Sequence, residues 1–299
     1  MVDKKIFKKK LKILIFGGSG FLGSHVAEEL ANRNYKVTVV DQKSIIWSNK
    51  NINFVKSDIL NFKKISKLIK KNNIVYNFAG IADIGYSYKK PLETLKINIM
   101  GNNNILHLCS KYKIKRYIFA STIYVYSEQG GFYRASKETS EILIAEYNRI
   151  YNLPYTVLRY GSIYGPRTNL KNGLFKIIYD AIKSKKLIYR GSDRAVRSYI
   201  HVQDAAKISA DILKKKFKNK NILVTGKQSI KIKSLLKSLG RIMKIDKKPI
   251  FLNDTQKGHY DVTPFSKRKI KTISCFPKKP LKLELGLKKL IEIIKRKNR

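Results

Sequence analysis

A run of glycines between a short apolar stretch and an amphipathic stretch constrains the fold of this chain more than any other feature. Lys12–Phe16 is typical of a buried strand, and residues 17–23 read GGSGFLG directly after it. In the stretch that follows, Val26 and Leu30 continue the apolar face of a helix. Glycines at such positions permit a tight turn whose backbone N–H groups face an anion at the helix N-terminus. The pattern predicts a strand–turn–helix unit that holds a phosphate.

An acidic residue lies where a dinucleotide site needs one. Lys36–Val40 predicts a second strand that ends in Asp41, 18 residues after Gly23. This carboxylate can accept hydrogen bonds from the ribose hydroxyls of an adenosine. It would repel a 2′-phosphate, so NAD is favoured over NADP, and Lys43 nearby weakens that preference. A glycine turn without a ligand is the less favoured alternative. The cofactor-binding residues expected at the turn are Gly17, Gly20, Phe21, Leu22, Gly23 and Asp41.

The first half of the chain alternates strand and helix patterns. This alternation predicts an α/β fold of Rossmann type, a doubly wound parallel sheet with a smaller C-terminal substrate-binding lobe. We expect residues 1–165 to form the NAD-binding domain and residues 166–299 mainly the lobe, partly interleaved with the first domain. The strands are expected at 12–16, 36–40, 52–55, 74–78, 117–120 and 155–159, and the helices at 61–71, 91–112, 133–147, 205–215, 229–243 and 283–295.

A tyrosine and a lysine stand at i and i+4 on one of these helices. Tyr133 and Lys137 would therefore point to one face. Tyrosine is a weak base at neutral pH because its ordinary pKa is about 10. A neighbouring ammonium and a positively charged nicotinamide ring would favour the phenolate and lower that pKa. The strand at 117–120 runs into Thr122, whose hydroxyl should lie beside them. We expect Thr122, Tyr133 and Lys137 to be the catalytic group.

Together these residues resemble the extended short-chain dehydrogenase/reductase family, of the NAD-dependent nucleotide-sugar epimerase/dehydratase type. The resemblance extends over nearly the whole chain. Its further motifs are SDI at 57–59, NFAG at 77–80, NIMG at 98–101, STIYVY at 121–126, LR at 158–159, YGPR at 164–167 and RSYIHVQD at 197–204.

The resemblance implies a role for each matched residue. Tyr133 would be the base, Thr122 would hydrogen-bond the reacting oxygen, and Lys137 would hold the ribose and tune the tyrosine. Hydride would pass from a sugar carbon to NAD, and its return to the other face of the keto sugar would give epimerisation. Likewise implied are a homodimer, substrate binding by Arg197, Ser162 and Thr122, and cofactor binding by Tyr133, Lys137, Asp58, Ile59, Ala79, Gly80 and Asn98.

Three departures from the family pattern bear on the reaction and on the substrate. Dehydratases and decarboxylases of the family resemble one another in acidic residues just after the catalytic threonine, where this chain has Ile123 and Tyr124. This disfavours dehydration and leaves epimerisation or carbonyl reduction. Only six residues separate Tyr126 from Tyr133, fewer than in common sugar epimerases, and Ser162 stands where many relatives have an asparagine. Both positions should lie near the sugar, which leaves open a substrate other than the ordinary UDP-hexoses. Residues 257–261 (KGHYD) resemble the family's late substrate-side segment loosely.

The charge leaves a competing interpretation open. Lys and Arg number 64 against 20 acidic residues, a formal net charge of +44. An RNA-binding protein on the same fold would use such a surface, with a steep salt dependence. A solvated surface is favoured, because the glycine turn and the segment leading to Tyr133 carry no lysine or arginine. A reductase that releases its nicotinamide in each cycle is another alternative.

The remaining residues point to a cytoplasmic protein without metal or membrane segment. Cys109 and Cys275 are too few for a disulfide framework, as expected in a reducing compartment. The apolar run at 13–16 is too short to cross a bilayer. The histidines are dispersed and none pairs with a cysteine at ligand spacing, so no metal site is expected. They are His25, His107, His201 and His259.

Overall fold

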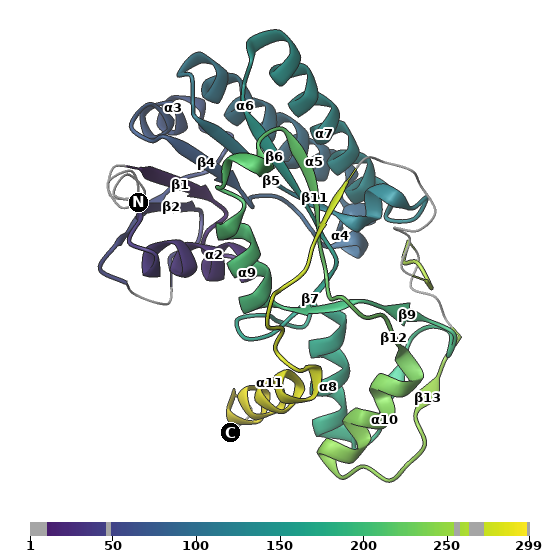
Figure 1. The fold of residues 1–299 in the computed structure, drawn as a ribbon. Helices are drawn as coiled ribbons and strands as arrows, with labels where there is room; N and C mark the ends of the chain where they lie inside the picture. The colour runs from purple at the N-terminus through teal and green to yellow at the C-terminus, as the bar shows by residue number, and fades with distance from the viewer. Residues whose placement is uncertain (1–10, 46–48, 254–257, 263–271, 298–299) are drawn as a thin grey trace.

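The computed structural model describes residues 11–45, 49–253, 258–262 and 272–297, and its centre is an eight-stranded sheet (Figure 1). All neighbouring strands pair in parallel. The winding of the sheet reverses between the neighbouring strands β4 (Ile74–Asn77) and β1 (Lys12–Phe16). Such a reversal opens a crevice at the carboxyl ends of the strands. The order is β14 (Ile273–Cys275), β11 (Lys220–Val224), β6 (Tyr155–Tyr160), β5 (Arg116–Thr122), β4 (Ile74–Asn77), β1 (Lys12–Phe16), β2 (Lys36–Asp41) and β3 (Ile52–Lys56). The predicted doubly wound sheet is confirmed.

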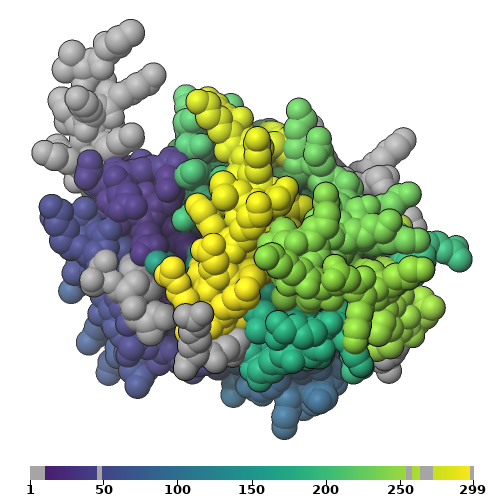
Figure 2. All heavy atoms as spheres, turned by 90° about the horizontal axis from the view of Figure 1, so that it is seen from below, coloured from purple at the N-terminus to yellow at the C-terminus, as the bar shows by residue number. Residues whose placement is uncertain are grey.

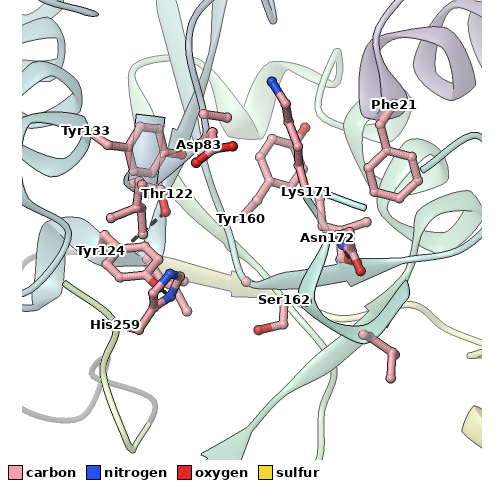
Figure 3. A pocket seen from close by; sticks show the side chains of 18 of the residues that line it. Phe21, Asp83, Thr122, Tyr124, Tyr133, Tyr160, Ser162, Lys171, Asn172 and His259 are labelled. Atoms are coloured by element: carbon pink, nitrogen blue, oxygen red, sulfur yellow. Dashed lines mark hydrogen bonds between the residues drawn. The ribbon is translucent and has the colours of Figure 1, made fainter. Parts of the chain in front are cut away.

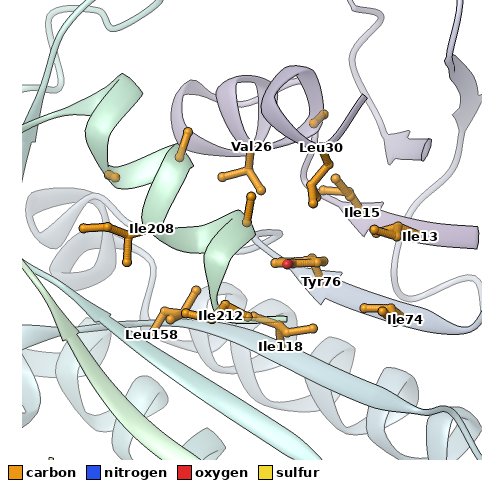
Figure 4. Packing of buried hydrophobic residues seen from close by; sticks show 14 of the residues in the cluster. Ile13, Ile15, Val26, Leu30, Ile74, Tyr76, Ile118, Leu158, Ile208 and Ile212 are labelled. Carbon is orange, nitrogen blue, oxygen red and sulfur yellow. The ribbon is translucent and has the colours of Figure 1, made fainter. Parts of the chain in front are cut away.

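Alternate residues of β1 serve the cores on the two faces of the sheet. Ile13 and Ile15 pack with Val26 of α2 (Phe21–Asn32) and with α9 (Val202–Asp211), as Figure 4 shows. Leu14 and Phe16 join the core on the other face, under α3 (Phe62–Lys70), α6 (Asn102–Lys111) and α7 (Gly131–Tyr151). Successive side chains of a strand point to opposite faces, so an unbroken apolar run is what a strand covered on both faces requires.

The helix predicted over 91–112 is divided. It consists of α5 (Pro91–Leu95), a π-helical turn η1 (Lys96–Gly101) and α6, and it follows a short helix α4 (Ile84–Lys89) that the sequence did not indicate. In the π turn the carbonyl of Asn98 accepts a hydrogen bond from Ser140 of α7 at 3.2 Å. A Cβ on Gly101 would lie 2.4 Å from the Ile59 side chain. These two contacts explain why the helix widens into a π turn here, which the periodicity of a single helix does not reveal. Such π turns are frequent at functional sites.

Several late segments lie apart from the sheet and form a lobe with its own core. Buried leucines and isoleucines of α8 (Gly173–Ser184), α10 (Ile232–Met243) and α11 (Leu283–Lys297) pack together. Figure 2 shows the face on which α10 and α11 are exposed. The short pairs are β7 (Ser162–Tyr164) with β10 (Tyr199–His201), β9 (Val196–Arg197) with β12 (Ile230–Lys231), and β8 (Ile188–Tyr189) with β13 (Ile250–Phe251).

The second half of the chain also contributes to the main sheet. Strands β11 and β14 extend it beyond β6, and α9 covers one of its faces beside α2. Neither α8 nor these two strands was expected from the sequence. The short 3₁₀ turns are η2 (Ile123–Tyr126) and η3 (Lys215–Phe217). Among the described helices, none combines the length and the apolar character that crossing a membrane requires.

A buried ion pair fixes α7 to the sheet. Arg159 of β6 is 2% exposed, and its Nη2 and Nε donate to the two carboxylate oxygens of Glu141 at 2.5 and 3.1 Å. The hydroxyl of Ser121 donates to the same carboxylate at 2.5 Å. Removing one partner of a buried pair leaves an uncompensated charge in a poorly solvated place.

We therefore expect Glu141→Gln to lower the free energy of unfolding by about 3–5 kcal/mol. Glu146→Gln serves as the matched control on the same helix, because its partner Arg149 is exposed and such pairs contribute little. Urea denaturation of both variants measures the difference. Equal stabilities for the two variants would contradict the role given to the buried pair.

Candidate active site

The glycine turn lies against the end of β4. Gly17 has φ +75°, and a Cβ there would lie 2.4 Å from the backbone nitrogen of Ala79. A Cβ on Gly23 would lie 2.3 Å from the carbonyl oxygen of Gly17. No side chain caps the start of α2 at Gly20. Only glycine fits these two contacts, and the helix N-terminus is left open toward the crevice, where it favours an anion.

The acidic residue expected for the adenosine ribose lies beside this turn. One carboxylate oxygen of Asp41 accepts the backbone N–H of Ser19 at 3.0 Å, and the other accepts that of Lys43 at 3.1 Å. Asp58 follows the next strand and accepts hydrogen bonds from Gln42 at 3.0 Å and from the backbone of Leu60 at 2.8 Å. The two carboxylates therefore stand at the ends of adjacent strands, β2 and β3.

Asn98 holds the segment that follows β4. Its Oδ1 accepts the backbone N–H of Ile81 at 2.7 Å, and its Nδ2 donates to Ser136 of α7 at 2.9 Å. A Cβ on Gly80, which has φ +148°, would lie 2.7 Å from the same Oδ1. Asn98 is buried, so in this structure it positions Gly80 rather than facing the crevice.

The three residues expected to be catalytic line one cavity at the carboxyl end of β5, and Figure 3 shows Thr122 and Tyr133 among them. Thr122 ends the strand, and its hydroxyl accepts the backbone N–H of Tyr124 at 3.2 Å. Tyr133 and Lys137 project from one face of α7. The Lys137 ammonium donates to the carbonyl of Ala120 at 2.8 Å and lies 6.0 Å from the centre of the Tyr133 ring. The strand end and the helix face thus bring a hydroxyl, a phenol and an amine together.

Burial decides the protonation of this group. It raises the pKa of Tyr133 to about 12, although a hydrogen bond with Thr122 acts in the opposite direction. It also lowers the pKa of Lys137 to about 8. For the protein on its own, the tyrosine shift is opposite to the one expected from the sequence, because desolvation of the phenolate outweighs a nearby amine that is itself hard to keep charged.

Arg197 closes the other side of the site. Its guanidinium donates to the carbonyl oxygens of Tyr260 at 2.6 Å and Asp261 at 2.7 Å, and it lies 4.5 Å from the centre of the Tyr260 ring. Ser162 at the start of β7 lines the same space. Of the late motif at 257–261, Lys257 lies outside the described residues. The remainder is fastened to the site by Arg197.

A cavity of about 910 Å³ joins these parts. Among its lining side chains the bases outnumber the acids, which suits an anionic ligand. Asp41, Asp58, Ile59, Ala79 and Asn98 are not among the residues that line it. The predicted residues that line it are Gly17, Gly20, Phe21, Leu22, Gly23, Gly80, Thr122, Tyr133, Lys137, Ser162 and Arg197.

A model of the NAD-dependent epimerase/dehydratase family matches residues 13–226. The chain belongs to this family. A putative UDP-glucose 4-epimerase of Methanocaldococcus jannaschii is 32% identical over 241 residues, which cover 73% of this chain and 78% of that protein. The resemblance drawn from the motifs is therefore confirmed, and the chain is an enzyme of the family.

Solved structures agree with the fold over almost the full length. UDP-glucose 4-epimerase from Thermotoga maritima with UDP-glucose has a TM-score of 0.81 at 26% identity, and the match covers 97% of this chain and 100% of that one. A variant of UDP-glucuronic acid 4-epimerase from Bacillus cereus, in complex with UDP-4-deoxy-4-fluoro-glucuronic acid and NAD, has a TM-score of 0.83 at 25% identity. That match covers 96% of this chain and 99% of the other.

For a member of this family, the cavity also contains polar residues that the sequence did not indicate. Asp83, Lys171 and His259 line it, and all three are labelled in Figure 3. Asp83 is the N-cap of the short helix α4, which is too brief to have a visible periodicity. His259 belongs to the late segment whose resemblance to the family was loose. Among the described residues, no cluster of His, Cys, Asp or Glu has the composition of a metal site.

The lowered pKa of Lys137 makes the stability of the NAD-free protein depend on pH. Below about pH 8 its buried ammonium opposes folding, and this penalty disappears as the pH rises from about 8 to the ordinary lysine pKa of about 10.4. The unfolding free energy of Lys137→Met relative to wild type should therefore be most favourable at pH 7 and should decline toward pH 10. Urea denaturation across this range measures it. A difference that stays constant with pH would contradict the buried ammonium.

Proposed function

We propose that this protein is an NAD-dependent epimerase of a nucleotide-diphosphate sugar, most simply a UDP-sugar 4-epimerase. The observation that carries the proposal is that Thr122, Tyr133 and Lys137 face one cavity together with the glycine turn and Arg197. The reaction requires a turn that binds a dinucleotide, a proton acceptor and a cationic side chain for the diphosphate, and all three lie in one cavity. The named relatives, which are UDP-sugar 4-epimerases, support it.

The residues divide the chemistry as follows. Gly17, Gly23 and the open N-terminus of α2 would hold the pyrophosphate of NAD, because a Cβ at either glycine would collide with backbone. Bound NAD supplies a hydride acceptor that can return the hydride. Tyr133 would take the proton of the sugar hydroxyl as a phenolate, the form that the positive nicotinamide ring of bound NAD and the Lys137 ammonium favour, and Thr122 would hydrogen-bond the same oxygen. Arg197 would bind the diphosphate of the substrate.

Asp41 supports NAD rather than NADP. Its carboxylate is fixed by the backbone of Ser19 at the edge of the turn, where a 2′-phosphate would meet a second negative charge. Asp58 and Ile59 would contact the adenine. Gly80 would line the cofactor, with Asn98 holding it from behind and Ala79 next to it in the chain.

The alternatives can be separated on specific grounds. Ile123 and Tyr124 supply no carboxylate next to Thr122, which disfavours dehydration. A reductase would release its nicotinamide in each cycle, so NAD that survives dialysis would favour the epimerase. An RNA-binding protein would bind nucleic acid with a steep salt dependence and without regard to Tyr133.

The proposal also covers the role of the C-terminal lobe and the cellular compartment of the protein. We infer that residues 166–299 mainly supply the substrate side of the cavity, through Arg197 and through β10, which pairs with the strand that begins at Ser162. In the same part of the chain, β11, α9 and β14 support the sheet. Cys109 is buried and Cys275 is partly buried, and both are free thiols. Free thiols are consistent with a cytoplasmic enzyme.

Replacing Tyr133 with Phe tests the mechanism. The ring packing is kept and the proton acceptor is lost, so turnover of UDP-glucose to its 4-epimer should fall by about 10²–10⁴-fold while the NAD content stays unchanged. Chromatography of the products and mass spectrometry of the bound nucleotide measure the two quantities. Tyr151→Phe, an exposed tyrosine of the same helix, is the control. Full activity of Tyr133→Phe would overturn the mechanism.

We further propose a homodimer through α5, η1 and α7. These elements present large apolar side chains to solvent, and Leu92 is 82% and Ile142 64% exposed. Met100 of the π turn η1 is exposed as well. The three belong to segments that pack on one another, so they can form a single apolar surface. Such surfaces usually mark an interface.

The double substitution Leu92→Glu and Ile142→Glu should convert the dimer to a monomer, because it places charges in the interface. Analytical ultracentrifugation gives the mass of each form. Leu285→Glu on α11 is the control, since that leucine is also exposed but lies on the lobe. A wild type that sediments as a monomer would refute the proposal.

A further inference from the structure

A tyrosine and a histidine that the mechanism above does not use face the cavity as a hydrogen-bonded pair. The phenol oxygen of Tyr124 lies 2.8 Å from Nδ1 of His259, and both residues line the cavity. In Figure 3 the two side chains lie on the same side of the site as Thr122 and Tyr133. They come from segments 135 residues apart, so the fold alone brings them together.

Tyr124 is placed next to the proton acceptor. It follows Thr122 by two residues in the 3₁₀ turn η2, whose first N–H groups are capped by the threonine hydroxyl. Its ring meets the Tyr133 ring edge to face, with centroids 6.2 Å apart, and packs on Tyr260 at 4.8 Å. A ligand atom bound by Tyr133 and Thr122 would therefore lie near Tyr124.

His259 is held by both of its neighbours. Gly258 has φ +88°, and a Cβ there would lie 2.7 Å from the ring and the oxygen of Tyr88. On the other side, Arg197 binds the carbonyl oxygens of Tyr260 and Asp261. The imidazole is thus fixed in the cavity without help from a ligand.

The short connection before α7 makes room for these rings. Gly130 and Gly131 have φ +104° and +49°. A Cβ on Gly130 would lie 2.9 Å from the Tyr124 ring, and one on Gly131 would lie 2.6 Å from the Tyr88 ring. The two glycines and Gly258 therefore allow Tyr88 and Tyr124 to fill the space beside this brief loop. The rings of Tyr88 and Tyr124, rather than a longer loop before α7, therefore form the wall of the cavity near Thr122 and Tyr133.

The pair is uncharged, and charges of both signs act on it. Burial raises the pKa of Tyr124 above its usual range. Burial and the Arg197 guanidinium lower the pKa of His259, with Asp83 acting in the opposite direction. The Arg197 guanidinium acts on both residues of the pair while it is engaged with backbone carbonyls, and the Asp83 carboxylate acts on His259. An uncharged phenol–imidazole pair can exchange hydrogen bonds with a sugar hydroxyl, whereas it offers no countercharge to a buried carboxylate.

We propose that the Tyr124–His259 pair binds a hydroxyl of the substrate's sugar beside Tyr133 and selects an uncharged hexosyl group over a uronic acid. This inference rests on the proposed function, because it assumes a nucleotide sugar in the cavity. The pair acts as a positioning and specificity element: it orients the ring while Tyr133 and Thr122 handle the reacting oxygen.

Calorimetric titration of the NAD-loaded protein with UDP, UDP-glucose, UDP-N-acetylglucosamine and UDP-glucuronic acid tests it. Tyr124→Phe and His259→Asn should weaken binding of the better uncharged UDP-sugar by about 2- to 10-fold, the loss of one hydrogen bond. Binding of UDP, which has no sugar beyond its ribose, should not change. Wild type should bind an uncharged UDP-sugar more tightly than UDP-glucuronic acid.

Tyr126→Phe is the matched control, since its phenol belongs to the same turn but contacts Arg159 and Thr272 away from the cavity. It should leave all four affinities unchanged. Equal losses for UDP and UDP-sugar, no loss at all, or tighter binding of UDP-glucuronic acid by wild type would each overturn the inference. If the affinities differ as expected but no UDP-sugar is epimerised, only the proposed function is refuted. If a UDP-sugar is epimerised but the Tyr124 and His259 variants bind it as tightly as wild type, only the role of the pair is refuted.

Discussion

The close approach of the glycine turn to the end of β4 is the contact on which the candidate site depends. Gly17 meets the backbone of Ala79, and Gly23 meets the carbonyl of Gly17, at distances that leave no room for a Cβ. This packing brings the N-terminus of α2 to the point where the winding of the sheet reverses. A larger residue at either position would push the helix away from the crevice, and the dinucleotide end of the cavity would lose its shape.

One face of α7 then connects the chemistry to the sheet. Tyr133, Lys137 and Glu141 follow at intervals of four residues, so they form a row along β5 and β6. The first meets Thr122, the second donates to the carbonyl of Ala120, and the third pairs with Arg159. The buried ion pair at the far end of the row fixes the helix axially, which holds the phenol and the amine at the strand end. Stability and candidate function are thus coupled through one helix.

Most of the sheet and the dinucleotide end could be predicted, because they depend on local pattern. The bounds predicted for β1 are those observed, and Asp41 ends β2 as expected. The lobe was predicted less well. Helix α8 and strand β11 lie in a stretch without clear periodicity, and β11 pairs with a strand some 65 residues earlier, which no local pattern encodes. The pKa direction of Tyr133 also depended on burial, which sequence spacing cannot supply.

The sequence by itself determined the strand–turn–helix unit, its acidic partner and the i, i+4 spacing of Tyr133 and Lys137, since each is a short-range consequence of residue type and helical geometry. The tertiary structure alone decided what surrounds the phenol. It brought His259 to Tyr124 from a distant segment and directed Arg197 to the carbonyl oxygens beside it. The physical reason is that hydrogen bonds and ring packing between remote segments form only when the sheet and the lobe have closed around one cavity.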